Sequence, residues 1–297
     1  MTTQSLDALY RTRYEPLRLR SRRPNTKRLY RISLKAFDRY LGGAARLSDL
    51  TNDKLSAFAA NLLDGGVAKK SVNRHLFNLL AMWRWLHTQG YVTNWPDVEL
   101  ETPPIRVPIA LLHEEVDRMM SAIAAETMAV GDLPAPIFWR SLMLVIWDTG
   151  ERIGAVMALT WERVDLDGGW VRFIAEDRKG GSEDNMLPIA MDTREALAEL
   201  RAHTRKKRGP VYHWPYSSTY IYNRLGRIMR RAGLPDTREY KFHVVRKSVA
   251  SHYEAAGGNA TDLLKHSSRK ITMSYLDPRI VKPTAPKDLL FRPVASS

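Results

Sequence analysis

The stretch LLKHSSRKITMSYLD, residues 263–277, places Tyr275 nine residues after His266. Two serines that follow the histidine can cap a short helix carrying the tyrosine, and Pro278 prevents that helix from continuing far. A phenol needs neighbouring cations to act as a nucleophile near neutral pH. Tyr275 is therefore either a reactive group set among cations or an ordinary aromatic residue that packs beside Ile271.

Two further basic residues lie three apart in KFHVVRKS, residues 241–248. On the helix expected there, His243 and Arg246 project from one face and could converge on a single anion. Such a pair is weak evidence by itself, because helical His/Arg pairs are common on protein surfaces. Its meaning depends on which other cations lie nearby.

Two more cations stand at positions suited to a phosphate. Arg152 opens an expected short helix, where unpaired backbone N–H groups favour an anion, although an ion pair with Glu151 or Asp148 is an equal alternative. Lys179 stands at the tip of an expected hairpin in DRKGG. A lysine beside other cations gives up its proton more readily, so Lys179 could donate a proton if the hairpin leans over the same phosphate.

The composition favours a polyanionic partner. The 297 residues include 46 Lys and Arg against 32 Asp and Glu, a formal charge of +14, which suits nucleic acid more than a membrane surface. The apolar run LMLVIW, residues 142–147, is far too short to span a bilayer, and the amino terminus lacks a signal-peptide core. The absence of cysteine excludes thiolate metal sites and cysteine nucleophiles. We expect a protein of the cytoplasm, associated with the nucleoid when bound to DNA.

The pattern of apolar residues predicts two domains. Helical periodicity dominates residues 1–98, and a proline-rich extended linker is expected at 99–108. Residues 109–297 are expected to form a mainly helical domain with a carboxyl-terminal tail and one small antiparallel sheet. Its strands are expected at Trp170–Ala175 and Asn185–Ile189. Later helices are predicted at Ser218–Ala232, Val244–Ala256 and Asp262–Tyr275.

The first domain carries a one-sided set of basic residues. Between residues 11 and 31 the only acid is Glu15. Contact with DNA phosphates explains this bias better than a solubilising helix surface, which remains the alternative. The candidate DNA-binding residues are Arg20, Arg22, Arg23, Lys27, Arg28, Lys69, Lys70 and Arg74.

Taken in chain order, these segments resemble the tyrosine recombinase family, which includes the phage integrases and the Xer-type recombinases. The resemblance rests on TGERIGAVMALTW, HVVR and LLKHSSRKITMSYL, with the hairpin lysine and the amino-terminal helices in matching places. It implies a two-domain clamp on double-stranded DNA, in which a helical core-binding domain precedes the catalytic domain. It also implies four protomers on paired DNA sites. The proline-broken tail, residues 278–297, carries an apolar cluster of Leu289, Leu290 and Phe291, so we expect it to dock on a neighbouring protomer; a tail that folds back onto its own domain is the alternative.

The resemblance further implies a mechanism without metal or cofactor. Tyr275 would attack a DNA phosphate and form a 3′-phosphotyrosyl bond. Lys179 would protonate the departing 5′ oxygen, and His243 would assist proton handling or phosphate binding. The pentacoordinate phosphorane would be stabilised by Arg152, Arg246 and His266. Integration or excision of DNA and replicon resolution all use this chemistry.

Three positions depart from the family pattern, and two other functions remain open. Ala155 stands where the family often has glutamate, Lys265 replaces a usual glycine, and Lys247 stands where histidine is frequent. A type IB topoisomerase would use the same chemistry to relax DNA. A protein that only binds DNA could also keep this fold, but every expected catalytic residue is present.

Overall fold

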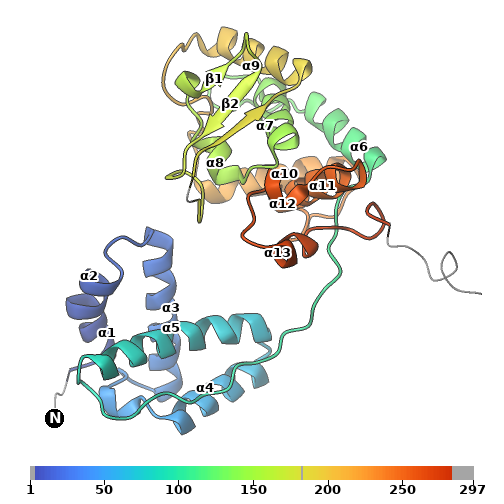
Figure 1. Cartoon of the computed structure of the whole chain (residues 1–297). Coiled ribbons are helices and arrows are strands. Elements are labelled where there is room, and N and C mark those ends of the chain that lie inside the picture. The colour runs from blue at the N-terminus through green and yellow to red at the C-terminus, as the bar shows by residue number, and fades with distance from the viewer. Residues whose placement is uncertain (1–3, 182, 283–297) are drawn as a thin grey trace, which may run out of the picture. The chain divides into compact units, whose positions relative to one another are not determined.

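The computed structural model describes residues 4–181 and 183–282 of the chain (Figure 1). The chain divides into two compact units, Met1–Ile105 and Arg106–Ser297. The division falls inside an extended segment, residues 94–112, that has neither helix nor strand. Prolines in this segment lack the N–H group that a helix needs. Each unit contains its own buried hydrophobic cluster.

The first unit is built from helices, as the sequence predicts. Its elements are α1 (Leu6–Leu9), a π-helical turn (Tyr10–Tyr14), α2 (Glu15–Arg18), α3 (Pro24–Leu41), a 3₁₀ turn (Leu47–Asp49), α4 (Asn52–Asp64) and α5 (Lys69–Thr88). Thr51 caps α4 by accepting a hydrogen bond from the backbone N–H of Lys54, and Gly42 ends α3 in the left-handed conformation. The aromatic rings of Phe37 and Phe58 pack edge to face in the core.

The second unit is mostly helical with one antiparallel sheet, which confirms the predicted fold class. Its helices are α6 (His113–Ala124), α7 (Ala135–Thr149), α8 (Ile153–Met157), α9 (Met191–Thr204), α10 (Ser218–Arg231), α11 (Phe242–Ala255), α12 (Ala260–Leu263) and α13 (Arg269–Met273), with a 3₁₀ turn at Trp161–Arg163. The strands β1 (Val164–Asp165), β2 (Trp170–Phe173) and β3 (Asn185–Pro188) pair in the order β1-β2-β3. Trp170 lies opposite Pro188 in the β2–β3 ladder.

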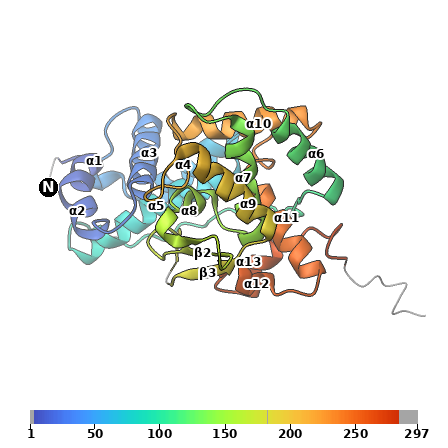
Figure 2. The ribbon, with the colours of Figure 1, turned by 90° about the horizontal axis from the view of Figure 1, so that it is seen from above.

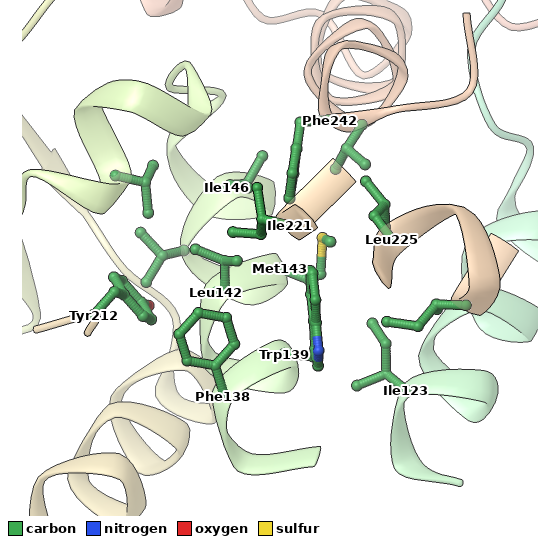
Figure 3. Packing of buried hydrophobic residues seen from close by; sticks show 14 of the residues in the cluster. Ile123, Phe138, Trp139, Leu142, Met143, Ile146, Tyr212, Ile221, Leu225 and Phe242 are labelled. Atoms are coloured by element: carbon green, nitrogen blue, oxygen red, sulfur yellow. The ribbon is translucent and has the colours of Figure 1, made fainter. Parts of the chain in front are cut away.

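Helix α7 lies at the centre of this unit. It packs against α6, α9 and α11, and its place beside α9 is visible from above in Figure 2. Trp139 of α7 stacks on Phe242 of α11 at a ring-centroid distance of 6.2 Å, within the apolar cluster drawn in Figure 3. At its carboxyl end, α7 also contacts α11 directly, because Arg246 donates a hydrogen bond to the backbone oxygen of Gly150.

The structure differs from the sequence predictions in several elements. Helices α6 and α9 and the short strand β1 were not predicted, and the two predicted strands are one or two residues shorter. The helix expected at Asp262–Tyr275 is wrong as one element, because a loop separates α12 from α13. Lys265 in that loop adopts a left-handed conformation with φ of 50°, which an α-helix cannot contain. Tyr275 therefore lies in the turn after α13 rather than on a helix.

Candidate active site

Arg246 is the buried centre of the candidate site. It lies on α11 and is 1% exposed. One terminal nitrogen donates to the backbone oxygen of Gly150, and the other donates to the backbone oxygen of Leu264 at 3.1 Å. The guanidinium group thus joins α11 to the end of α7 and to the α12–α13 loop.

The remaining guanidinium nitrogen of Arg246 suits an anionic ligand. Within the described part of the chain, its buried Nε has no hydrogen-bond partner. Burial and the charge of Arg152 lower the pKa of Arg246 to about 10. A buried donor without a partner is costly, and a phosphate oxygen would satisfy it.

The hydrogen bonds of His266 determine its tautomer. Arginine can only donate, so His266 Nε2 accepts from Arg246 Nη2 at 3.4 Å. The ring proton then lies on Nδ1, which is 3.0 Å from Thr272 Oγ1. Thr272 is fully buried and its hydroxyl group also contacts Thr261 Oγ1 at 3.0 Å. Burial, followed by the charges of Arg246 and Arg152, lowers the pKa of His266 to about 4.

His243 is the second histidine in contact with the tyrosine. Its ring centroid is 5.0 Å from that of Tyr275, in an edge-on arrangement. The residue is exposed to solvent, but partial desolvation of the imidazole lowers the pKa of His243 to about 4, with contributions from the charges of Lys247, Arg246 and Arg152. Lys247, one of the departures from the family pattern, thus helps to keep this imidazole neutral.

Tyr275 packs among apolar residues and also faces the cations. It is 9% exposed and belongs to a small buried cluster with Leu264 and Leu276. Its ring centroid is 4.7 Å from the His266 ring and 5.9 Å from Arg246 Cζ. The structure therefore confirms that Tyr275 packs among apolar residues, and this packing places the ring against the basic groups, while its role as a reactive group stays a prediction.

Arg152 and Lys179 share a cavity with His266. The cavity has a volume of about 460 Å³, and its lining also includes Lys265 and Glu183. These two lining residues form an exposed ion pair, with a distance of 3.2 Å between Lys265 Nζ and Glu183 Oε1. His266 therefore links two groups of candidate catalytic residues. It contacts Arg246 and Tyr275, and it also lines the cavity that Arg152 and Lys179 line.

Glu151 and Arg178 were not identified from the sequence. The alternative of an ion pair between Glu151 and Arg152 is wrong, because Arg152 contacts the carboxylate through its backbone N–H, at 3.2 Å. The carboxylate instead pairs with Arg178 Nε at 2.6 Å and faces Arg246 Nη1 at 3.8 Å. In the sequence, Glu151 and Arg178 are marked only by their positions directly before the candidate catalytic residues Arg152 and Lys179.

The Ala155 departure is explained by the core. Ala155 is 2% exposed and lies in the main hydrophobic cluster of the second unit. A carboxylate is instead supplied to Arg246 from Glu151, four residues earlier.

The candidate DNA-binding residues of the first unit occupy its surface. Arg20, Arg22, Arg23, Arg28, Lys69, Lys70 and Arg74 are exposed, and Lys27 is half-buried. Lys27 lies 3.9 Å from Glu15, which also pairs with Arg31, and Lys69 pairs with Glu101 at 3.1 Å. Some of these charges are therefore partly neutralised within the unit.

No helix in the described part of the chain is long and apolar enough to cross a membrane. Among residues 4–181 and 183–282, no group of three or more histidine, aspartate or glutamate side chains could hold a metal ion.

The fold consists of a helical unit and a mostly helical unit with a three-stranded sheet, and the site places a tyrosine close to two histidines and a buried arginine. Together these features define the class of tyrosine recombinases. The sequence profile of the Phage integrase family matches residues 110–280, and that of the phage integrase N-terminal SAM-like domain matches residues 14–90. The chain belongs to the phage integrase family. Its enzyme class is that of the site-specific recombinases.

Relatives of known function support this assignment. Tyrosine recombinase XerC of Xylella fastidiosa is 26% identical over 236 residues, which cover 76% of each chain. Tyrosine recombinase XerC of Oceanobacillus iheyensis is 26% identical over 275 residues, which cover 85% of each chain.

Solved structures show the same fold at lower identity. Lambda integrase (75–356), solved as a dimer bound to a COC′ core site, has a TM-score of 0.70 and 20% identity, covering 93% of this chain and 96% of that chain. The XerH site-specific recombinase bound to a palindromic difH substrate has a TM-score of 0.69 and 18% identity, covering 86% of this chain and 77% of that chain.

Proposed function

We propose that this recombinase cuts and rejoins double-stranded DNA through a 3′-phosphotyrosyl intermediate formed by Tyr275. The observation that carries the proposal is the position of the Tyr275 ring, 4.7 Å from the His266 ring, 5.0 Å from the His243 ring and 5.9 Å from Arg246 Cζ. The neutral imidazole of His243 can accept the phenol proton when Tyr275 attacks phosphorus, and the guanidinium group of Arg246 places a positive charge beside the ring. Rejoining requires no external energy source, because the phosphotyrosyl bond replaces the phosphodiester that was cut.

The proposed step breaks one bond and forms another. Tyr275 Oη attacks phosphorus, its proton passes to the neutral imidazole of His243, and the P–O5′ bond breaks. Lys179 donates a proton to the departing 5′ oxygen. The depressed pKa of His243, about 4, leaves its imidazole neutral and able to accept a proton at pH 7. Rejoining reverses these transfers when a 5′ hydroxyl attacks the phosphotyrosine.

The transition state gathers negative charge on the non-bridging phosphate oxygens. Arg246 Nε and Arg152 would stabilise that charge, and the burial of Arg246 strengthens its contribution. His266, whose ring nitrogens contact Arg246 and Thr272, would support the charge by holding Arg246 in place. Loss of one such donor costs about 10²- to 10³-fold in rate in comparable enzymes. In the proposed reaction, only side chains of the protein act on the phosphate, without a metal or an organic cofactor.

Both units would contact the DNA. We assign residues 1–98 to a core-binding domain, 99–108 to a linker and 109–297 to the catalytic domain, which together clamp the duplex. The exposed basic residues of the first unit, such as Arg20 and Lys70, would bind phosphates. Each lost phosphate contact should reduce the salt dependence of binding, the slope of log K against log salt, by about 1.

Assembly on paired DNA sites is the second part of the proposal. Lambda integrase, which shares the fold, has been solved as a tetramer bound to a Holliday junction. The segment proposed to dock on a neighbouring protomer is the tail, residues 278–297, of which residues 283–297 lie outside the described residues. Truncation after Pro278 should abolish assembly on DNA in size-exclusion chromatography, and unchanged assembly would contradict this role. We place the protein in the cytoplasm, with the nucleoid when bound to DNA.

Covalent trapping tests the chemistry. Wild type and Tyr275→Phe are incubated with sheared DNA that flanks the protein's own gene, and DNA that stays protein-linked after denaturation is recovered and sequenced. We expect adducts with wild type alone, at defined sites of integration, excision or replicon resolution. Adducts scattered over the DNA would favour topoisomerase-like relaxation, and salt-sensitive binding without adducts would favour a protein that only binds DNA.

A further inference from the structure

A buried ion pair connects the hairpin that carries Lys179 to the centre of the second unit. Arg178 Nε lies 2.6 Å from Glu151 Oε1, and the two side chains are 3% and 1% exposed. A buried ion pair is stable only when further hydrogen bonds satisfy both partners. The surroundings of Glu151 and Arg178 meet this condition on both sides.

The carboxylate of Glu151 is shared among three parts of the fold. Its Oε1 atom also accepts a hydrogen bond from Asn185 Nδ2 of β3 at 3.4 Å. Its Oε2 atom accepts from the backbone N–H of Arg152 at 3.2 Å and faces Arg246 Nη1 of α11 at 3.8 Å. One carboxylate therefore contacts the hairpin, the α7–α8 turn and the phosphate-binding arginine.

Arg178 in turn organises the tip of the hairpin. Its Nη1 atom donates to the backbone oxygen of Glu183 at 3.0 Å, and its backbone oxygen accepts from the N–H of Gly181 at 3.1 Å. The turn is tight, because a Cβ atom at Gly181 would lie 2.8 Å from Arg178 Cβ. The position of the neighbouring residue, Lys179, therefore depends on where Arg178 is held.

Other ion pairs of the hairpin are less suited to this task. The Arg163–Asp177 pair is partly exposed, and the Lys265–Glu183 pair is exposed. Pairs in contact with water contribute little and leave their side chains free to move. The buried Glu151–Arg178 contact constrains the hairpin more strongly, since removing either partner leaves an uncompensated buried charge.

We propose that Glu151 and Arg178 are positioning residues that hold Lys179 at the reacting phosphate. Lys179 lines the same cavity as Arg152 and His266, and the shared carboxylate ties its hairpin to Arg246. The inference rests on the proposed function, in which Lys179 protonates the 5′ oxygen when the P–O5′ bond breaks. Displacing Arg178 should therefore slow proton donation more than it slows attack by Tyr275.

A substrate with sulfur in place of the bridging 5′ oxygen isolates that step. In this substrate the P–S5′ bond breaks, and the sulfur leaves as a thiolate that needs no proton, because thiols are far more acidic than alcohols. A variant that impairs only proton donation is rescued by the sulfur substrate. A variant that impairs phosphate binding or attack by the tyrosine is slow on both substrates.

The experiment compares single-turnover rates of covalent adduct formation by the full-length chain on oxygen and sulfur substrates of the same sequence. The variants are Arg178→Met, Lys179→Met and the matched control Arg172→Met, at an exposed position of the same hairpin. We expect Arg178→Met to be about 10- to 100-fold slower than wild type on oxygen and within about threefold of wild type on sulfur. Arg172→Met should match wild type on both.

Two outcomes overturn the inference. Either Arg178→Met is slow on both substrates to the same degree, or it is as fast as wild type on oxygen. If its thermal unfolding shows lost structure, Arg178→Lys, which keeps the charge, is measured instead and must show the same selective rescue. Failure of the proposed function looks different, because wild type would then form no adduct or Lys179→Met would not be rescued by sulfur.

Discussion

Gly150→Ala should both destabilise the second unit and impair its active site. Gly150 ends α7 with φ of 60°, a left-handed conformation that costs a residue with a Cβ atom about 1–2 kcal/mol. The added Cβ would lie 2.7 Å from Leu264 Cδ2 and 3.3 Å from Val249 Cγ1. Overpacking of this kind costs about 1–3 kcal/mol.

The net loss in the free energy of unfolding is about 1–4 kcal/mol, because alanine also reduces the entropy of the unfolded chain by roughly 0.5–1 kcal/mol, which offsets part of these two costs. Activity should fall as well. The backbone oxygens of Gly150 and Leu264 both accept hydrogen bonds from Arg246, so a shift of either residue moves the guanidinium group. We expect adduct formation to slow by about tenfold or more.

Thermal and urea unfolding, with the single-turnover adduct assay, test this prediction against Gly154→Ala. Gly154 lies inside α8 and does not adopt positive φ, and a Cβ atom added there would meet none of the described atoms beyond its own helix within 4 Å. Alanine at this position should therefore stabilise by up to about 1 kcal/mol. If Gly150→Ala stayed within about 0.5 kcal/mol of wild type with full activity, the strain and contact argument would be refuted.

Three further predictions concern the site itself. Thr272→Val keeps the shape of the side chain but removes the hydrogen-bond partner of His266 Nδ1. It should lower the free energy of unfolding in urea by about 1–2 kcal/mol and slow adduct formation, and wild-type values for both would show that Thr272 does not fix the tautomer of His266. Arg246→Lys should slow adduct formation about 10²- to 10³-fold, since the compact lysine ammonium cannot reach the widely separated acceptors that the planar guanidinium fork spans. A near-normal rate would show that charge alone suffices. The pKa values of His243 and His266 are lowered from 6.5 to about 4, so the unfolded chain binds more protons between these pH values. The contribution of these two histidines to stability should be constant above pH 6.5 and fall as the pH drops toward 4. His266→Asn should therefore make the dependence of Tm on pH less steep in this range, and an unchanged slope would contradict the lowered pKa of His266.

Local sequence patterns predicted much of the site. The spacing of His243 and Arg246 placed both on one helix face because an α-helix repeats every 3.6 residues. Gly42 ended its predicted helix for an equally local reason, since glycine accepts positive φ without steric cost. The single helix predicted for residues 262–275 was wrong, because the backbone N–H groups of Lys265 and His266 bond back to Asp262 and Thr261 and end α12 with Lys265 in the left-handed conformation.

By itself the sequence determined the fold class and the excess of positive charge, since these depend on composition and on short spacings, and its family resemblance supplied the six candidate catalytic residues. Only the tertiary structure decided which groups meet. Glu151 lies next to Arg152, yet its carboxylate pairs with Arg178, 27 residues away, and faces Arg246, 95 residues away. The reason is physical: burial removes water from the competition for a charge, so packing of distant elements, rather than nearness along the chain, selects the partner.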